Sequence, residues 1–119
     1  MLLQTVTPVS VLGTTVLLAL FLCLTAHIAA RNVLGDVDPR RALYVGPLPA
    51  VISVVGNAFD APGALIVLAA LLVDGTMFWW SYEEPRRVVA MMTLIHGVVT
   101  TLLVGVLLLA SVLLASIPG

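Results

Sequence analysis

The sequence predicts an all-α integral membrane protein, folded as a four-helix bundle of two antiparallel hairpins with both termini on the extracytoplasmic side. Two observations predict this fold. Hydrophobic residues make up 61% of the 119 residues and charged residues only 9%, with a mean hydropathy of +1.21. All the positive charge lies in two short segments between apolar stretches. Because a soluble domain carries about 25% charged residues, this chain has too few to cover a water-exposed surface.

Four apolar stretches are candidate membrane spans, for which about 20 residues are needed. They cover residues 10–30, 43–59, 63–82 and 88–116, and they make residues 1–119 a single four-span domain. The second stretch is the shortest and contains Pro47 and Pro49. Residues 1–7 carry no Lys or Arg, so we expect the first span to be retained rather than cleaved as a signal peptide.

The arginines indicate how the spans are oriented. Arg31, Arg40 and Arg41 follow the first span, whereas Arg86 and Arg87 follow the third. With four spans both loops lie on one side, which the positive-inside rule makes cytoplasmic. With three spans the two groups would lie on opposite sides. We therefore expect a multi-pass protein of the cell membrane whose Arg-bearing loops are cytoplasmic.

Composition also excludes several classes of function. The net charge is −1, so there is no basic surface to bind nucleic acid. A single Cys rules out a disulfide framework and a Cys-rich metal site. We expect no catalytic residues, no metal and no cofactor. The absence of Lys, with many Ala, Val and Leu residues, is typical of a GC-rich prokaryotic genome.

Small residues recur every four positions on the last span. Thr93, Gly97, Thr101 and Gly105 form this row. Such rows let helix backbones approach closely in lipid, so they predict a helix-packing seam. The seam serves either the internal bundle or a homo-oligomer.

Asp74 is the only acid inside a predicted span, and a carboxylate there needs a partner. Asp74 lies eleven residues before Pro85, the centre of its loop, and His96 lies eleven residues after it. With a rise of about 1.5 Å per residue in both helices of a hairpin, the two reach a similar depth. We therefore predict that Asp74 and His96 can form a contact. His27 lies at a shallower depth on the first span.

Pro47 and Pro49 remove two backbone donors from the second span, which predicts a kink. Together with His27, Asp74 and His96 they define a candidate polar layer. It is interpreted either as a structural hydrogen-bond cluster or as a proton-linked or ligand-binding site. Two histidines can also ligate haem in a helix bundle, but the offset in depth between His27 and His96 disfavours that interpretation.

The length and the four-span plan resemble those of the small multidrug transporters, which work as dimers around an embedded glutamate in the first span. This chain has no acid in its first span, so the resemblance covers topology alone. We expect a non-catalytic membrane protein that acts in the lipid bilayer through helix packing, as a homo-oligomer or as an accessory subunit of a larger membrane complex. The alternative is a proton-coupled small transporter or channel protomer that uses Asp74 and His96.

Overall fold

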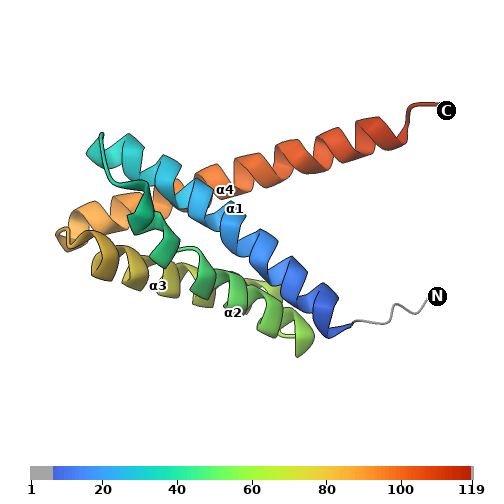
Figure 1. Ribbon diagram of the computed structural model, residues 1–119, viewed down its shortest axis with the longest axis horizontal. Helices are drawn as coiled ribbons and strands as arrows, with labels where there is room; N and C mark the ends of the chain where they lie inside the picture. The colour runs from blue at the N-terminus through green and yellow to red at the C-terminus, as the bar shows by residue number, and fades with distance from the viewer. Residues whose placement is uncertain (1–6, 119) are drawn as a thin grey trace.

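The computed structural model describes residues 7–118 and is built only from helices (Figure 1). The elements are α1 (Pro8–Leu34), the 3-10 helix η1 (Pro39–Tyr44), α2 (Pro47–Ala58), α3 (Gly63–Tyr82) and α4 (Arg86–Ala115). Three of them, α1, α3 and α4, are long and apolar enough to cross a membrane. The prediction of an all-α fold is therefore confirmed, with three helices that are long and apolar enough to cross a membrane.

Local sequence explains where α1 begins and ends. Thr7 and Ser10 form a capping box at the start of α1, in which the Thr7 hydroxyl accepts the Ser10 N–H at 3.0 Å. Pro8 follows at the first helical position, where its missing N–H costs nothing. Gly35 ends the helix with a φ of 81°, a backbone conformation that favours glycine.

The second apolar stretch differs from the expectation of one helix over residues 43–59 that is kinked at Pro47 and Pro49. A six-residue 3-10 helix, η1, is followed by the twelve-residue helix α2. Pro47 and Pro49 lie in the first turn of α2, where backbone N–H groups have no partner within the helix. They therefore begin a new helix rather than bend a continuous one. At about 2.0 Å per residue in η1 and 1.5 Å in α2, the two pieces together extend about 30 Å.

Gly46 joins η1 to α2 and packs directly against α1. A Cβ atom added to Gly46 would lie 2.5 Å from the Cys23 sulfur and 2.6 Å from the backbone of Ala19 and of Cys23. Only a residue without a side chain allows this approach. Gly46 therefore fixes where the broken segment crosses α1.

The four α-helices form a ring in which each packs against the next, α1 on α2, α2 on α3, α3 on α4 and α4 on α1. The buried core lies toward the end that carries the arginines, and its largest fully buried side chains include Phe78, Met92 and Val45. Toward the other end α4 diverges from α1 and extends beyond the rest of the bundle (Figure 1). Residues 104–118 are all exposed.

The two Arg-bearing loops lie at the same end of the molecule (Figure 1). A reciprocal pair of hydrogen bonds joins η1 to the last turn of α3 there: the Ser81 hydroxyl donates to the Arg41 carbonyl at 2.7 Å, and the Arg41 guanidinium donates to the Ser81 carbonyl. In a continuing helix the Ser81 carbonyl would accept the N–H of residue 85, which is a proline. The arginine therefore supplies the donor that Pro85 lacks.

Candidate intramembrane polar site

Asp74 on α3 and His96 on α4 meet inside the bundle. The imidazole Nδ1 of His96 lies 2.5 Å from the carboxylate Oδ2 of Asp74, and both residues are only 3% exposed. The ring of Phe78, one turn after Asp74, packs edge-on against the imidazole with its centroid 5.5 Å away. The structure thus brings together the two residues that lie equally far from Pro85 in sequence.

The second nitrogen of the imidazole faces α1. His96 Nε2 lies 2.7 Å from the Thr25 hydroxyl and 3.2 Å from the Leu22 carbonyl. Thr25 is fully buried, and its hydroxyl donates to that same Leu22 carbonyl at 3.1 Å. Thr100, one turn beyond His96, donates to the Thr25 hydroxyl at 3.1 Å. Three helices therefore contribute to one hydrogen-bond network.

The contacts of Nε2 favour one arrangement of protons in the pair. A carbonyl oxygen only accepts, so we assign the ring hydrogen to Nε2, from which Leu22 O can accept at 3.2 Å. In this tautomer the Thr25 oxygen accepts from His96 and from Thr100 while it donates to Leu22. One further proton then lies between Asp74 Oδ2 and His96 Nδ1. Whichever atom holds it, the pair has no net charge, which suits the low dielectric of a membrane interior.

One atom of the site is left without a partner. Oδ1 of Asp74 is buried and makes no hydrogen bond among the described residues. Asp74 and His96 line a cavity of about 220 Å³ to which all four α-helices contribute. The α2 residues on its wall are Pro49 and Ser53, and most of the remaining lining is aliphatic. A buried acceptor of this kind calls for a donor, from water or from a ligand.

The other members of the predicted polar layer are not part of this network. His27 makes no hydrogen bond to it, and the buried Nδ1 of His27 has no partner among residues 7–118. Pro47 is exposed at the start of α2, whereas Pro49 lies on the cavity wall. Both ring nitrogens of His96 are engaged by protein atoms, so this histidine offers none to a haem iron. In the described chain no group of three or more His, Cys, Asp or Glu side chains is placed to hold a metal ion.

Sequence reasoning missed Thr25 and Gly46. The available signal for Thr25 was a hydroxyl within an apolar span, because such groups commonly hydrogen-bond across helices in lipid. The signal for Gly46 was a glycine directly before a proline pair. Neither signal identifies the partner residue on another helix.

Only part of the predicted helix-packing seam on α4 lies beside another helix of the structure. Thr93, Gly97 and Thr101 line an apolar groove of about 380 Å³ along the α3–α4 hairpin. A Cβ added to Gly97 would lie 3.6 Å from the Leu71 side chain of α3, an ordinary contact. At Gly105 an added Cβ would meet nothing within 4 Å. The first part of the row therefore lies beside α3, whereas no atom of residues 7–118 lies within 4 Å of a Cβ added to Gly105, the last member.

Comparison with known proteins places the chain in a family. The model of the family of unknown function DUF7473 matches residues 5–118, and the chain belongs to that family. No curated protein and no solved structure matches the chain.

Proposed function

We propose that this member of the DUF7473 family is a small proton-linked membrane transporter in which Asp74 and His96 hold the coupling proton. The observation that carries the proposal is Asp74 itself. One of its carboxylate oxygens lies 2.5 Å from His96 Nδ1, the other is buried without a partner among residues 7–118, and the residue lines a cavity. An ionisable group kept inside a membrane in this way is typical of proton and substrate pathways.

The proposed chemistry is an exchange of a proton for a cation. With one shared proton the pair is neutral. A cationic donor that binds Oδ1 brings a second positive charge beside the imidazole, in a medium that screens charge poorly. Release of the shared proton restores neutrality, with the substrate cation paired to the Asp74 carboxylate. The aliphatic wall of the cavity favours a substrate with an apolar body and one N–H-bearing cationic group.

The broken second segment supports the same proposal. Discontinuous helices commonly form the binding sites of secondary transporters. Here the break at Gly46 places Pro49 and Ser53 of α2 on the cavity wall, opposite the residues of α3 and α4. We propose that η1 and α2 together make one crossing of the cell membrane. The chain then crosses four times as two antiparallel hairpins, with the arginine loops in the cytoplasm and both termini outside.

A second candidate function is assembly by helix packing, as a homo-oligomer or as a subunit of a larger membrane complex. The observation that favours it is the end of α4, where residues 104–115 are exposed and a Cβ added to Gly105 would meet nothing of residues 7–118 within 4 Å. Four helices in one chain leave little room for a complete pathway, so assembly is also compatible with transport. The mass of the protein in detergent tests this candidate.

The experiment for the main proposal uses benzamidinium, which combines an apolar ring with N–H donors and stays charged at neutral pH. Purified protein in weakly buffered detergent solution is mixed with the probe, and an indicator dye reports released protons. We expect the wild type to release about one proton per bound probe, because the cation and the shared proton oppose each other at Asp74. Uptake of labelled benzamidinium into proteoliposomes with an acidic interior, in exchange for protons that leave the vesicle, then tests transport.

Asp74→Asn should abolish both proton release and uptake. Asp60→Asn is the matched control, since Asp60 is an exposed acid in the loop before α3, and it should behave as wild type. Circular dichroism checks that both variants remain folded. Binding of the probe to wild type without proton release would disprove the exchange, and equal responses from the two variants would disprove the role of Asp74.

A further inference from the structure

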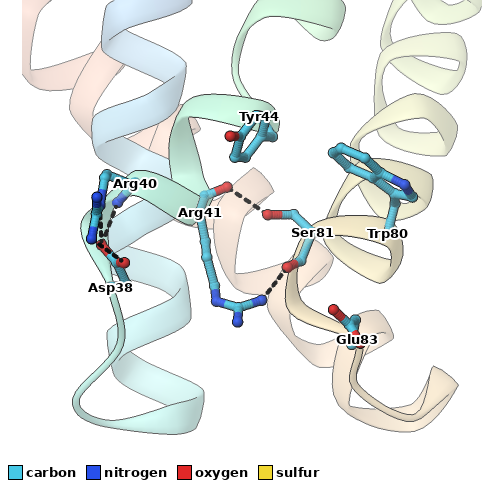
Figure 2. A pocket seen from close by; sticks show the side chains of 7 residues that line it. All are labelled: Asp38, Arg40, Arg41, Tyr44, Trp80, Ser81 and Glu83. Atoms are coloured by element: carbon cyan, nitrogen blue, oxygen red, sulfur yellow. Dashed lines mark hydrogen bonds and ion pairs between the residues drawn. The ribbon is translucent and has the colours of Figure 1, made fainter.

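A second pocket lies at the end of the molecule where the two arginine loops meet, away from the Asp74 cavity. It lies between η1 and the last turn of α3 (Figure 2). Its volume is about 480 Å³. Arg41 and Tyr44 line it from η1, and Trp80, Ser81 and Glu83 line it from the end of α3. Nothing in the proposed transport function uses these residues.

Arg41 is a fixed cation in this pocket. Its guanidinium is held by the Ser81 carbonyl, and its own carbonyl accepts the Ser81 hydroxyl, so the residue is bound at two points (Figure 2). A guanidinium has five N–H donors, and this is the one side-chain bond that it makes among residues 7–118. No carboxylate of the described chain lies within 4.0 Å of it. Its remaining donors are therefore available to an anion.

The neighbouring arginine is already neutralised. Arg40 pairs with Asp38 at 3.2 Å, and Asp38 also accepts the backbone N–H of Arg40 at 3.0 Å. That backbone hydrogen bond, and then the guanidinium, hold the pKa of the Asp38 carboxyl below its usual value. Asp38 therefore stays ionised and cancels the charge of Arg40. The unpaired charges on the pocket wall are Arg41, which is positive, and Glu83, which is negative.

An aromatic pair forms the apolar side of the pocket. The rings of Tyr44 and Trp80 meet edge to face with centroids 5.5 Å apart, and both residues are more than half exposed. Tyr and Trp near the end of a span favour the headgroup level of the bilayer. The pocket thus has a charged side, which suits a lipid headgroup, and an aromatic side, which suits the apolar part of the same lipid.

We propose that this pocket binds the headgroup of one phospholipid. The phosphodiester pairs with the free donors of Arg41, as guanidinium groups do with phosphate. The terminal group of the lipid, an ammonium or a hydroxyl, donates to the Glu83 carboxylate. The glycerol and the first carbons of the acyl chains lie against Tyr44 and Trp80. The pocket therefore selects lipids whose headgroup ends in a hydrogen-bond donor, such as phosphatidylethanolamine and phosphatidylglycerol, over phosphatidylcholine.

Native mass spectrometry of delipidated protein with each of the three lipids tests the proposal. We expect phosphatidylethanolamine and phosphatidylglycerol to be retained about tenfold more than phosphatidylcholine, the effect of one hydrogen bond to a charged group. Glu83→Gln should remove this preference, whereas Glu84→Gln, outside the pocket, should keep it. Arg41→Gln, which keeps an N–H for Ser81 but loses the charge, should lower retention of all three lipids about tenfold. Arg87→Gln is its matched control and should behave as wild type.

Equal retention of the three lipids by wild type would overturn the role of Glu83. Unchanged retention by Arg41→Gln would overturn the role of Arg41. Displacement of the lipid by millimolar inorganic phosphate would identify a free-phosphate site and overturn the choice of a lipid. If Arg41→Gln melts at a lower temperature than wild type, the selectivity of the Glu83→Gln variant decides the proposal, because the Glu83 carboxylate makes no hydrogen bond among residues 7–118.

Discussion

The hydroxyl of Thr25 lies 2.7 Å from Nε2 of His96 and links α1 to α4 in the middle of the bundle. The same oxygen accepts from Thr100 and donates to the Leu22 carbonyl. This hydroxyl thus helps to hold the imidazole ring against the Asp74 carboxylate.

Removal of this hydroxyl should destabilise the protein. Thr25→Val keeps the volume but leaves the Nε2–H group of His96 without its nearer acceptor, and we expect a loss of about 1–3 kcal/mol in the free energy of unfolding. Thr25→Ser should recover most of it. Thr15→Val is the control, because the Thr15 hydroxyl bonds only to its own helix at Val11. Denaturation in detergent followed by circular dichroism measures all three, and equal stability of the two valine variants would contradict the assignment.

Asp74 and His96 should behave as one unit in a double-mutant cycle. Asp74→Asn and His96→Ala each leave a buried polar partner unsatisfied, which is costlier than the loss of both groups together. We therefore expect the double variant to lose less stability than the sum of the single variants, with a coupling of about 0.5–3 kcal/mol. Unfolding free energies of the four proteins give the coupling directly. Strict additivity would show that the two side chains do not interact.

Gly46 should tolerate no side chain. An added methyl group would meet backbone atoms of α1 at 2.6 Å, so Gly46→Ala has to separate the broken segment from α1. We expect a loss of about 1–3 kcal/mol from overpacking. Gly13→Ala is the matched control within α1, since an added Cβ there meets nothing within 4 Å. It should be neutral or stabilising by up to about 1 kcal/mol, because Ala favours the helix. Melting temperatures of both variants check the contrast.

The two glycines of the α4 row should respond differently to leucine. Gly97→Leu places a large side chain against Leu71, which lies 3.6 Å from the first added atom. We expect it to force α3 and α4 apart and to cost about 1–3 kcal/mol. Gly105→Leu has free space within the chain and should leave the melting temperature unchanged. A fall in the oligomer mass of Gly105→Leu in detergent would show that this end of α4 packs on a second copy, whereas an unchanged mass would mean that it faces lipid.

Cysteine labelling tests the proposed four crossings. In a Cys23→Ala background we expect Ser116→Cys to react with a membrane-impermeant maleimide in intact cells. Asp36→Cys, in the loop after α1, should react only after the cells are permeabilised, because the arginine loops are cytoplasmic in this topology. Reaction of both positions from the same side would show that η1 and α2 do not complete a crossing.

Much of the fold follows from sequence, because it depends on composition and on local signals. The apolar content requires helices, whose backbone N–H and C=O groups hydrogen-bond within the helix when no water is available in lipid. Helix α3 has the predicted bounds of residues 63–82. The last helix was expected over residues 88–116 and is observed over Arg86–Ala115. The meeting of Asp74 with His96 could also be anticipated, because a short loop centred on Pro85 fixes the register of an antiparallel hairpin.

Only the tertiary structure decided the form of the second segment and the third member of the polar network. Two prolines are compatible with a kinked helix or with a new helix start, and the close packing of Gly46 on Cys23 selects the second. Thr25 and His96 are 71 residues apart, and no short loop fixes the register of α1 against α4. That register depends on how four helices pack around a shared interior, a property of all four together that no local stretch of the sequence encodes.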